Sequence, residues 1–409
     1  MSKQPTPYYC TICKKKHYRG KTYDAHLQYK KGESSTESMI TIERDDRDDA
    51  MITYTDDVVK ERLGKYGAVY FSEDIKESVE DILGNEIKKE ILDDFFKALM
   101  KYEDFVEQLK NTKLTPNLTV LLYGPPGTGK TSLTRGFAKR YDIPICIVES
   151  DRLVSPLLGD TIKNIRGVVE LAAEISKERG AFILFFDEID AIGSERSNIH
   201  EVGEIKRAVI SFLQVIDRVN YEGVPLAIFG ATNHQHQLDS AIWRRFTFHF
   251  EFDFPDYHLR KKIIESFVNK IKNAKIGVDD LIFTKLNNEY KEIQDIVNEM
   301  ETKLGKTISE FDMSVLWDEI KKKSRIDGLI KLTFGYSGSD IERGTRVALL
   351  KALSTEILTY DIFYESLKLV GGTATHVDRQ EILSSNKIYS KQVKNSGNRN
   401  KISASPPEI

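Results

Sequence analysis

Three cysteines among 409 residues are too few for a disulfide framework, so the chain is expected in a reducing, cytoplasmic compartment. No run of eighteen apolar residues occurs, and residues 1–20 are polar, so neither a membrane span nor a secretory leader is predicted. Neither sign of charge dominates, because 60 Lys and Arg face 63 Asp and Glu. The chain as a whole therefore has no field to recruit nucleic acid. Its length predicts two or three domains.

A glycine-rich loop is the strongest motif of the sequence. Residues 124–131 read G-P-P-G-T-G-K-T, after a short apolar, β-branched run at 119–123 and before a helical stretch at 132–140. Strand, loop and helix in this order form the context of a phosphate-binding loop, whose backbone N–H groups surround the phosphates. The sequence therefore predicts binding of a nucleoside triphosphate such as ATP. The residues expected to bind it are Gly127, Thr128, Gly129, Lys130, Thr131 and Ser132.

Two neighbouring carboxylates end the most apolar predicted strand, at residues 182–188. This is the Walker B pattern, in which Asp187 and the Thr131 hydroxyl hold Mg²⁺. Glu188 is the candidate base that polarises the attacking water, and Lys130 is expected to reach the β and γ phosphates. The sequence thus predicts an ATPase that depends on Mg²⁺.

From residue 74 onward the chain resembles the AAA clade of AAA+ ATPases. The similarity rests on D-I-L-G-N-E at 81–86, on the strand that ends at Asn233, on L-D-S-A-I-W-R-R-F at 238–246 and on F-G-Y-S-G-S-D-I at 334–341. The resemblance implies that Ile82 and Gly84 contact the adenine and that Asn233 acts as sensor 1. It also implies that the arginine pair, Arg244 and Arg245, reaches the γ-phosphate bound by a neighbouring subunit. A ring homo-oligomer, in the family usually a hexamer, would follow.

The same resemblance places the first pore loop at Leu157 and Leu158, where family members carry an aromatic residue that grips polypeptide. A plain packing loop is the alternative. Helical periodicity is predicted within residues 74–110, and helical runs at 293–304 and 313–321 lie in an expected insertion.

The N-terminal segment has the ligand types of a structural zinc site. Cys10, Cys13, His17 and His26 would supply two thiolates and two imidazoles, which close a tetrahedral Zn²⁺ site. A basic tail with incidental thiols is the alternative. The segment is basic and carries tyrosines, so it would contact either nucleic acid or protein.

The predicted fold class is an α/β parallel-sheet P-loop NTPase domain with an α-helical lid and a small zinc-finger-like N-terminal module. The expected boundaries are a basic module at 1–31, an acidic linker or hairpin at 32–71, the ATPase domain at 72–253, the lid at 254–375 with an insertion at about 274–327, and a disordered tail at 376–409. Remodelling or unfolding of a protein substrate, directly or through an adaptor, is the expected function. A nucleic-acid-associated ATPase and an assembly switch that threads nothing remain the alternatives.

Overall fold

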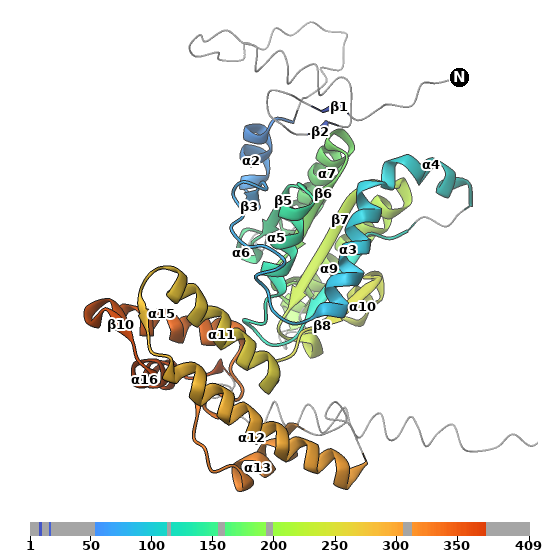
Figure 1. Ribbon diagram of the computed structural model, residues 1–409. Helices are drawn as coiled ribbons and strands as arrows, with labels where there is room; N and C mark the ends of the chain where they lie inside the picture. Colours follow the sequence, from blue (N-terminus) through green and yellow to red (C-terminus); the bar gives the residue numbers. More distant parts are fainter. Residues whose placement is uncertain are drawn as a thin grey trace, which may run out of the picture.

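A six-stranded sheet forms the centre of the first domain (Figure 1), with strand order β3-β5-β6-β7-β4-β8. Its strands are β3 (Gly67–Tyr70), β4 (Thr119–Tyr123), β5 (Ile145–Val148), β6 (Phe182–Phe186), β7 (Leu226–Thr232) and β8 (Phe248–Glu251). All neighbouring pairs are parallel except β3 and β5, which are antiparallel. The predicted parallel α/β fold is confirmed, with one antiparallel strand added at its edge.

The computed structural model describes residues 8–9, 16–17, 54–112, 116–153, 160–193, 199–305 and 313–373. The expected zinc ligands Cys10, Cys13 and His26, the expected pore-loop pair Leu157 and Leu158, and the expected tail all lie outside these ranges. His17 ends the two-residue strand β2 (Lys16–His17), which pairs antiparallel with β1 (Tyr8–Tyr9). Among the described helices, none is both long and apolar enough to cross a bilayer.

Helices cover both faces of the sheet, so its central strands β6 and β7 are buried along their whole length. These elements are α2 (Asp56–Gly64), α3 (Glu86–Met100), α4 (Tyr102–Thr112), α5 (Lys130–Arg140), α6 (Ser150–Leu153), α7 (Asp160–Arg179), α8 (Asp190–Gly193), α9 (Ile199–Glu222), the 3-10 turn η1 (Gln235–Gln237) and α10 (Ser240–Arg245). Alternate strand residues enter two separate cores. Leu121, for example, packs with α7 and α9, whereas Val120 and Leu122 pack with α3 and α5.

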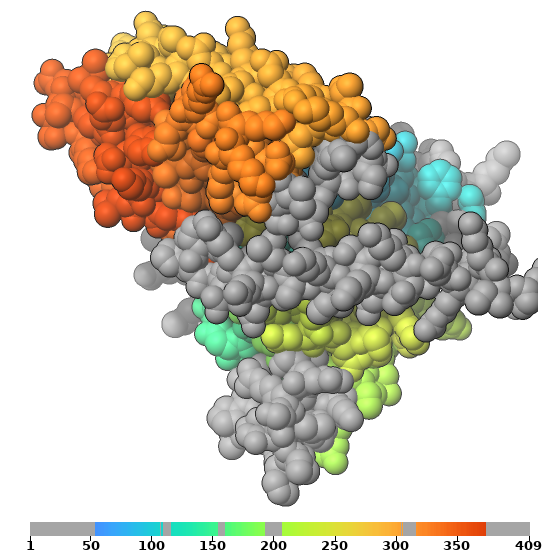
Figure 2. Space-filling view, turned by 90° about the horizontal axis from the view of Figure 1, so that it is seen from below, coloured from blue at the N-terminus to red at the C-terminus, as the bar shows by residue number. Residues whose placement is uncertain are grey.

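The second domain is helical and has its own core. Its elements are α11 (Tyr257–Asn273), β9 (Gly277–Val278), α12 (Leu281–Leu304), α13 (Met313–Lys323), α14 (Leu329–Leu332), α15 (Gly338–Thr355), β10 (Ile357–Leu358) and α16 (Tyr360–Val370). Figure 2 shows these gold-to-red residues as one continuous body beside the green and lime surface of the first domain. The helical runs expected in the insertion are present as the second half of α12 and as α13.

Residues 54–71 belong to the sheet domain, although the sequence places them in a linker or hairpin. Helix α2 and strand β3 occupy this stretch, and Val59 and Leu63 are fully buried in the core shared with α7. The Tyr54 backbone N–H donates to Glu178 Oε1 (3.1 Å), and its hydroxyl donates to Glu174 Oε2 (2.7 Å). This packing favours a domain that begins by residue 54 rather than at residue 72.

Candidate active site

The phosphate loop joins β4 to α5 at the carboxyl edge of the sheet. Gly124 follows the last residue of β4, has a φ of +129° and donates its N–H to Thr232 O (3.2 Å). A side chain at Gly124 would collide with the carbonyl oxygen of Phe252, so only glycine allows the segment leading to the second domain to cross here. Helix α5 begins at Lys130, directly after the loop.

Lys130 is buried within this loop, with 7% of its surface exposed. Its Nζ donates to Gly124 O (2.8 Å) and Pro125 O (2.7 Å), two carbonyls of its own loop. Burial lowers the pKa of this ammonium to about 8, against the opposing effect of the Asp187 charge. A buried cation with incomplete charge compensation fits an anionic ligand, because a phosphate would supply the missing negative charge.

Thr131 and Asp187, the two residues expected to bind Mg²⁺, lie next to each other. Thr131 Oγ1 lies 3.4 Å from Asp187 Oδ2, although the two residues come from different elements. A hydroxyl and a carboxylate are oxygen ligands of the kind that Mg²⁺ prefers. These residues therefore fit the metal ion, and Thr128, Ser132 and the glycines lie on the same loop and helix start.

Glu188 follows Asp187 at the end of β6 and is exposed. Its φ of +52° lies in the left-handed region, which is unusual for a residue with a side chain and is often found at functional sites. Its backbone N–H donates to Asp187 Oδ1 (3.2 Å), so the two acids are held together.

A hydrogen bond that the sequence did not reveal fixes the turn after these acids. Asp190 is 8% exposed, and Thr232 Oγ1 donates to its Oδ1 (2.6 Å). Thr232 is the last residue of β7, and the half-buried Asn233 comes next. Because β7 lies between β4 and β6, Asn233 follows the strand that is flanked by the loop strand and the acid strand.

The turn at residues 81–85 touches both the phosphate loop and the helical domain. Ile82 packs at Gly129, where an added Cβ would lie 3.5 Å from Ile82 Cγ2. Gly84 has a φ of +82°, and an added Cβ would meet Leu259 Cδ2 of α11 at 2.6 Å. An ion pair between Lys270 Nζ and Asp81 Oδ1 (3.2 Å) forms a further link to α11. Ile82 thus lies beside the loop, whereas Gly84 lies against α11 of the helical domain.

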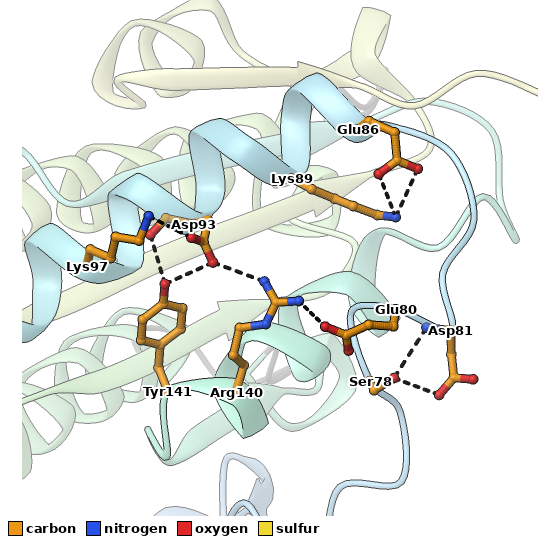
Figure 3. Close-up of polar contacts among 9 residues, drawn as sticks. All are labelled: Ser78, Glu80, Asp81, Glu86, Lys89, Asp93, Lys97, Arg140 and Tyr141. Atoms are coloured by element: carbon orange, nitrogen blue, oxygen red, sulfur yellow. Dashed lines mark hydrogen bonds and ion pairs between the residues drawn. The ribbon is translucent and has the colours of Figure 1, made fainter.

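A polar network holds this turn, which lies within the stretch 74–110 where helical periodicity is predicted (Figure 3). Ser78 Oγ donates to Asp81 Oδ2 (2.8 Å), and Arg140 pairs with both Glu80 and Asp93, the latter at 3.0 Å. Helix begins only at Glu86, after Asn85 in a left-handed conformation. The network fastens the turn to α3 and α5, the two helices behind the loop.

The start of α15 also reaches the phosphate loop. Ser339 N donates to Gly127 O (3.2 Å), and a Cβ on Gly127 would lie 2.6 Å from Ser337 Oγ. Ser337 caps α15 in a reciprocal capping box with Asp340. Asp340 is 1% exposed and also accepts from Thr373 N (2.8 Å). The F-G-Y-S-G-S-D-I motif at 334–341 therefore contacts the phosphate loop.

The arginine pair lies apart from these residues, at the end of α10. Arg245 Nε donates to Asp217 Oδ1 (2.9 Å) and Oδ2 (3.1 Å) on α9, a partner that the sequence did not indicate. Arg244 is exposed and has no hydrogen-bond or ion-pair partner within the described ranges. The structure thus brings the loop, the acids, Asn233 and the turn at residues 81–85 together, whereas the arginines remain outside this group.

A phosphate loop beside a strand-end acid pair on a mostly parallel sheet defines a P-loop nucleoside triphosphatase. Residues 120–254 match the ATPase family associated with various cellular activities (AAA). This match identifies residues 120–254 as an AAA ATPase domain, a kind of domain whose cofactors are ATP and Mg²⁺.

Proteins similar to this chain in sequence or in fold include other AAA proteins. An uncharacterized AAA family ATPase, y4kL, of Sinorhizobium fredii is 35% identical over 44% of this chain and 52% of its own length. The 26S proteasome regulatory subunit 6A of Encephalitozoon cuniculi is 32% identical over 54% of each chain. This chain therefore spans about half the length of either relative. In fold it is similar to the FIGL-1 AAA domain in complex with ADP, with a TM-score of 0.54, 20% identity, and coverage of 84% of this chain and 98% of the other.

Proposed function

We propose that the chain hydrolyses ATP at this site and uses the cycle to remodel, disassemble or unfold a protein substrate. The observation that supports the chemistry is the meeting of Lys130, Thr131 and Asp187 at the carboxyl edge of the sheet. Lys130 would exchange its two loop carbonyls for phosphate oxygens. Bound Mg²⁺ would supply charge neutralisation on the phosphates, and Thr131 and Asp187 would hold it.

In this proposal Glu188 polarises the attacking water and accepts its proton. The exposed carboxylate stands next to Asp187, at the edge where the phosphates would end. Asn233 orients the same water through its amide, from the end of the neighbouring strand. Ile82 and Gly84 hold the adenine, because their turn packs against the loop where Ile82 lies at Gly129.

We further propose a ring in which Arg244 completes the site of the neighbouring subunit. Arg244 is exposed without a partner in the described part of the chain, whereas Arg245 is already paired with Asp217. That pair is about half exposed and therefore contributes little energy, so Arg245 remains available as a second finger. The γ-phosphate is what the fingers contact, so ATP would promote assembly, with six subunits the expected number.

Mixing two inactive variants tests this arrangement. Arg244→Ala protein keeps its loop and Lys130→Ala protein keeps its fingers, so a joint ring should regain part of the ATPase activity. An arginine finger contributes about 10³- to 10⁵-fold in rate where it has been measured. Parents that stay inactive when sedimentation shows joint assembly would refute action in trans.

The helical domain, residues 254–373, would act as the lid of the site. Ser339 contacts the loop and Lys270 and Leu259 contact the adenine turn, so the lid would sense the nucleotide from two sides. The extra helices α12 and α13 would form an insertion within the lid.

The N-terminal residues would form a small zinc module through Cys10, Cys13, His17 and His26, which recruits protein or nucleic acid. Protein remodelling is favoured because relatives include proteins named as proteasome regulatory subunits. A nucleic-acid-associated ATPase would instead show salt-dependent DNA or RNA binding by the full chain that is lost in Cys10→Ser/Cys13→Ser protein.

A further inference from the structure

Trp243 lies between two aromatic rings from the sheet. Its ring centroid is 5.0 Å from that of Tyr123, with the planes tilted by 59°, and 4.7 Å from that of His249, with the planes at 18°. His249 Nε2 is also 2.9 Å from the carbonyl oxygen of Trp243. The tryptophan is therefore fixed by both its ring and its backbone.

The two partners of Trp243 share one face of the sheet. Leu121 of β4 pairs with His249 of β8, and Tyr123 pairs with Glu251. Side chains alternate along a strand, so Tyr123 and His249 point to the same side. Trp243 thus packs where β4 ends, and Tyr123 is the residue directly before Gly124 of the phosphate loop.

The side chain of Arg244, unlike that of Trp243, makes no ring contact, hydrogen bond or ion pair with the described residues. It is exposed, and α10 comprises only six residues, which is too short to be stable as an isolated helix. The helix is fixed at its start by Asp239, which accepts from Ala241 N (2.7 Å), and at its end by Thr119 Oγ1, which donates to Arg245 O (3.0 Å). Between these ends, the fully buried Ile242 and the rings around Trp243 hold the backbone that carries Arg244.

We propose that Trp243 is a positioning residue for Arg244: it fixes the finger relative to the base of the phosphate loop of the same subunit. This inference rests on the proposed action of Arg244 in trans. A short series of contacts joins Lys130 to Arg244 within one subunit. Lys130 Nζ donates a hydrogen bond to Gly124 O (2.8 Å), and Gly124 follows Tyr123 in the chain. The Tyr123 ring in turn contacts the ring of Trp243, the residue before Arg244. These contacts therefore link the phosphate loop of a subunit to its own Arg244, which acts on the neighbouring subunit.

The mixing experiment separates this role from a general effect on folding. Trp243→Ala is placed either in the finger donor, together with Lys130→Ala, or in the acceptor, together with Arg244→Ala. In the donor it should lower the stimulated kcat by about 10- to 10²-fold, the loss expected when a catalytic group shifts by about 1 Å, with the acceptor's KM for ATP unchanged. In the acceptor it should leave the stimulation unchanged.

Two further donor variants act as controls. Trp243→Phe keeps a ring between Tyr123 and His249 and should restore most of the stimulation. Tyr221→Ala removes an aromatic side chain that is 86% exposed on α9 and should have no effect. Equal losses from donor and acceptor, or none from the donor, would overturn the positioning role while action in trans stands. Parents that show no complementation at all would overturn the proposed trans site and this inference with it.

Discussion

Replacing Asp340 by asparagine tests whether its buried carboxylate stabilises the helical domain at the start of α15, the segment that contacts the phosphate loop. Oδ2 accepts from Ser337 N (2.9 Å) and Thr373 N (2.8 Å), and Oδ1 accepts from Arg343 Nη2 (2.8 Å). Asparagine keeps one oxygen but turns an N–H₂ group toward the guanidinium. Since hydrogen bonds to charged groups contribute about 1.5–3 kcal/mol each, Asp340→Asn should cost about 2 kcal/mol. Asp340→Ala leaves both backbone donors buried without an acceptor and should cost about 3–5 kcal/mol.

Urea unfolding of each variant, followed by a signal from the helical domain, measures these costs. The control is Asp361→Asn, because Asp361 is also an acid in the first turn of a helix of this domain but is exposed. Hydrogen bonds from Thr373 and Ser337 offset desolvation and lower the pKa of Asp340, so its stabilisation is present above its unfolded pKa and is lost as pH falls through the folded value. An Asp340→Asn protein as stable as Asp361→Asn protein, with the same acid titration of stability as wild type, would refute the reasoning.

The other predictions concern the chemistry and the N-terminal module. Glu188→Gln should still bind ATP while hydrolysis falls by about 10²-fold or more, the range for a positioned base, and wild-type turnover would disprove the assignment. Burial holds the Lys130 pKa at about 8, and a bound phosphate would raise it, so ATP binding should take up a proton and weaken as pH rises above about 8. Calorimetry in buffers of different ionisation enthalpy measures this uptake, which Lys130→Ala should lack. Purified protein should carry one zinc per chain, absent from Cys10→Ser/Cys13→Ser protein by elemental analysis.

The parts of the fold that could be predicted are those with a local cause. The strand at 119–123 is β4 to the residue, because a β-branched apolar run ends there at glycine and proline. Helix α13 covers the helical run predicted at 313–321. The acid pair could also be placed, since carboxylates directly after a fully apolar strand must lie at the carboxyl edge of a parallel sheet.

Other features depend on contacts between distant residues and have no local signal. Strand β3 is short and sits beside acidic sequence, and only its pairing with β5 makes it part of the sheet. Residues 78–81 have apolar neighbours at helical spacing, yet they are not helical, and Arg140 of α5 forms an ion pair with Glu80 in this segment. The Asp217 partner of Arg245 lies on another helix, so the sequence around the arginines could not reveal it.

Gly127 shows how one residue serves both the nucleotide and the domain arrangement. Glycine in a phosphate loop is usually explained by the need for backbone N–H groups to approach the phosphates. In this chain the space of a Gly127 Cβ is already occupied by the hydroxyl groups of Ser337 and Ser339, and the Gly127 carbonyl accepts from Ser339 N. A side chain at Gly127 would therefore have to displace these hydroxyl groups from the loop. A movement of the Gly127 carbonyl on binding phosphate would also change its hydrogen bond from Ser339 N, which joins the loop to the start of α15.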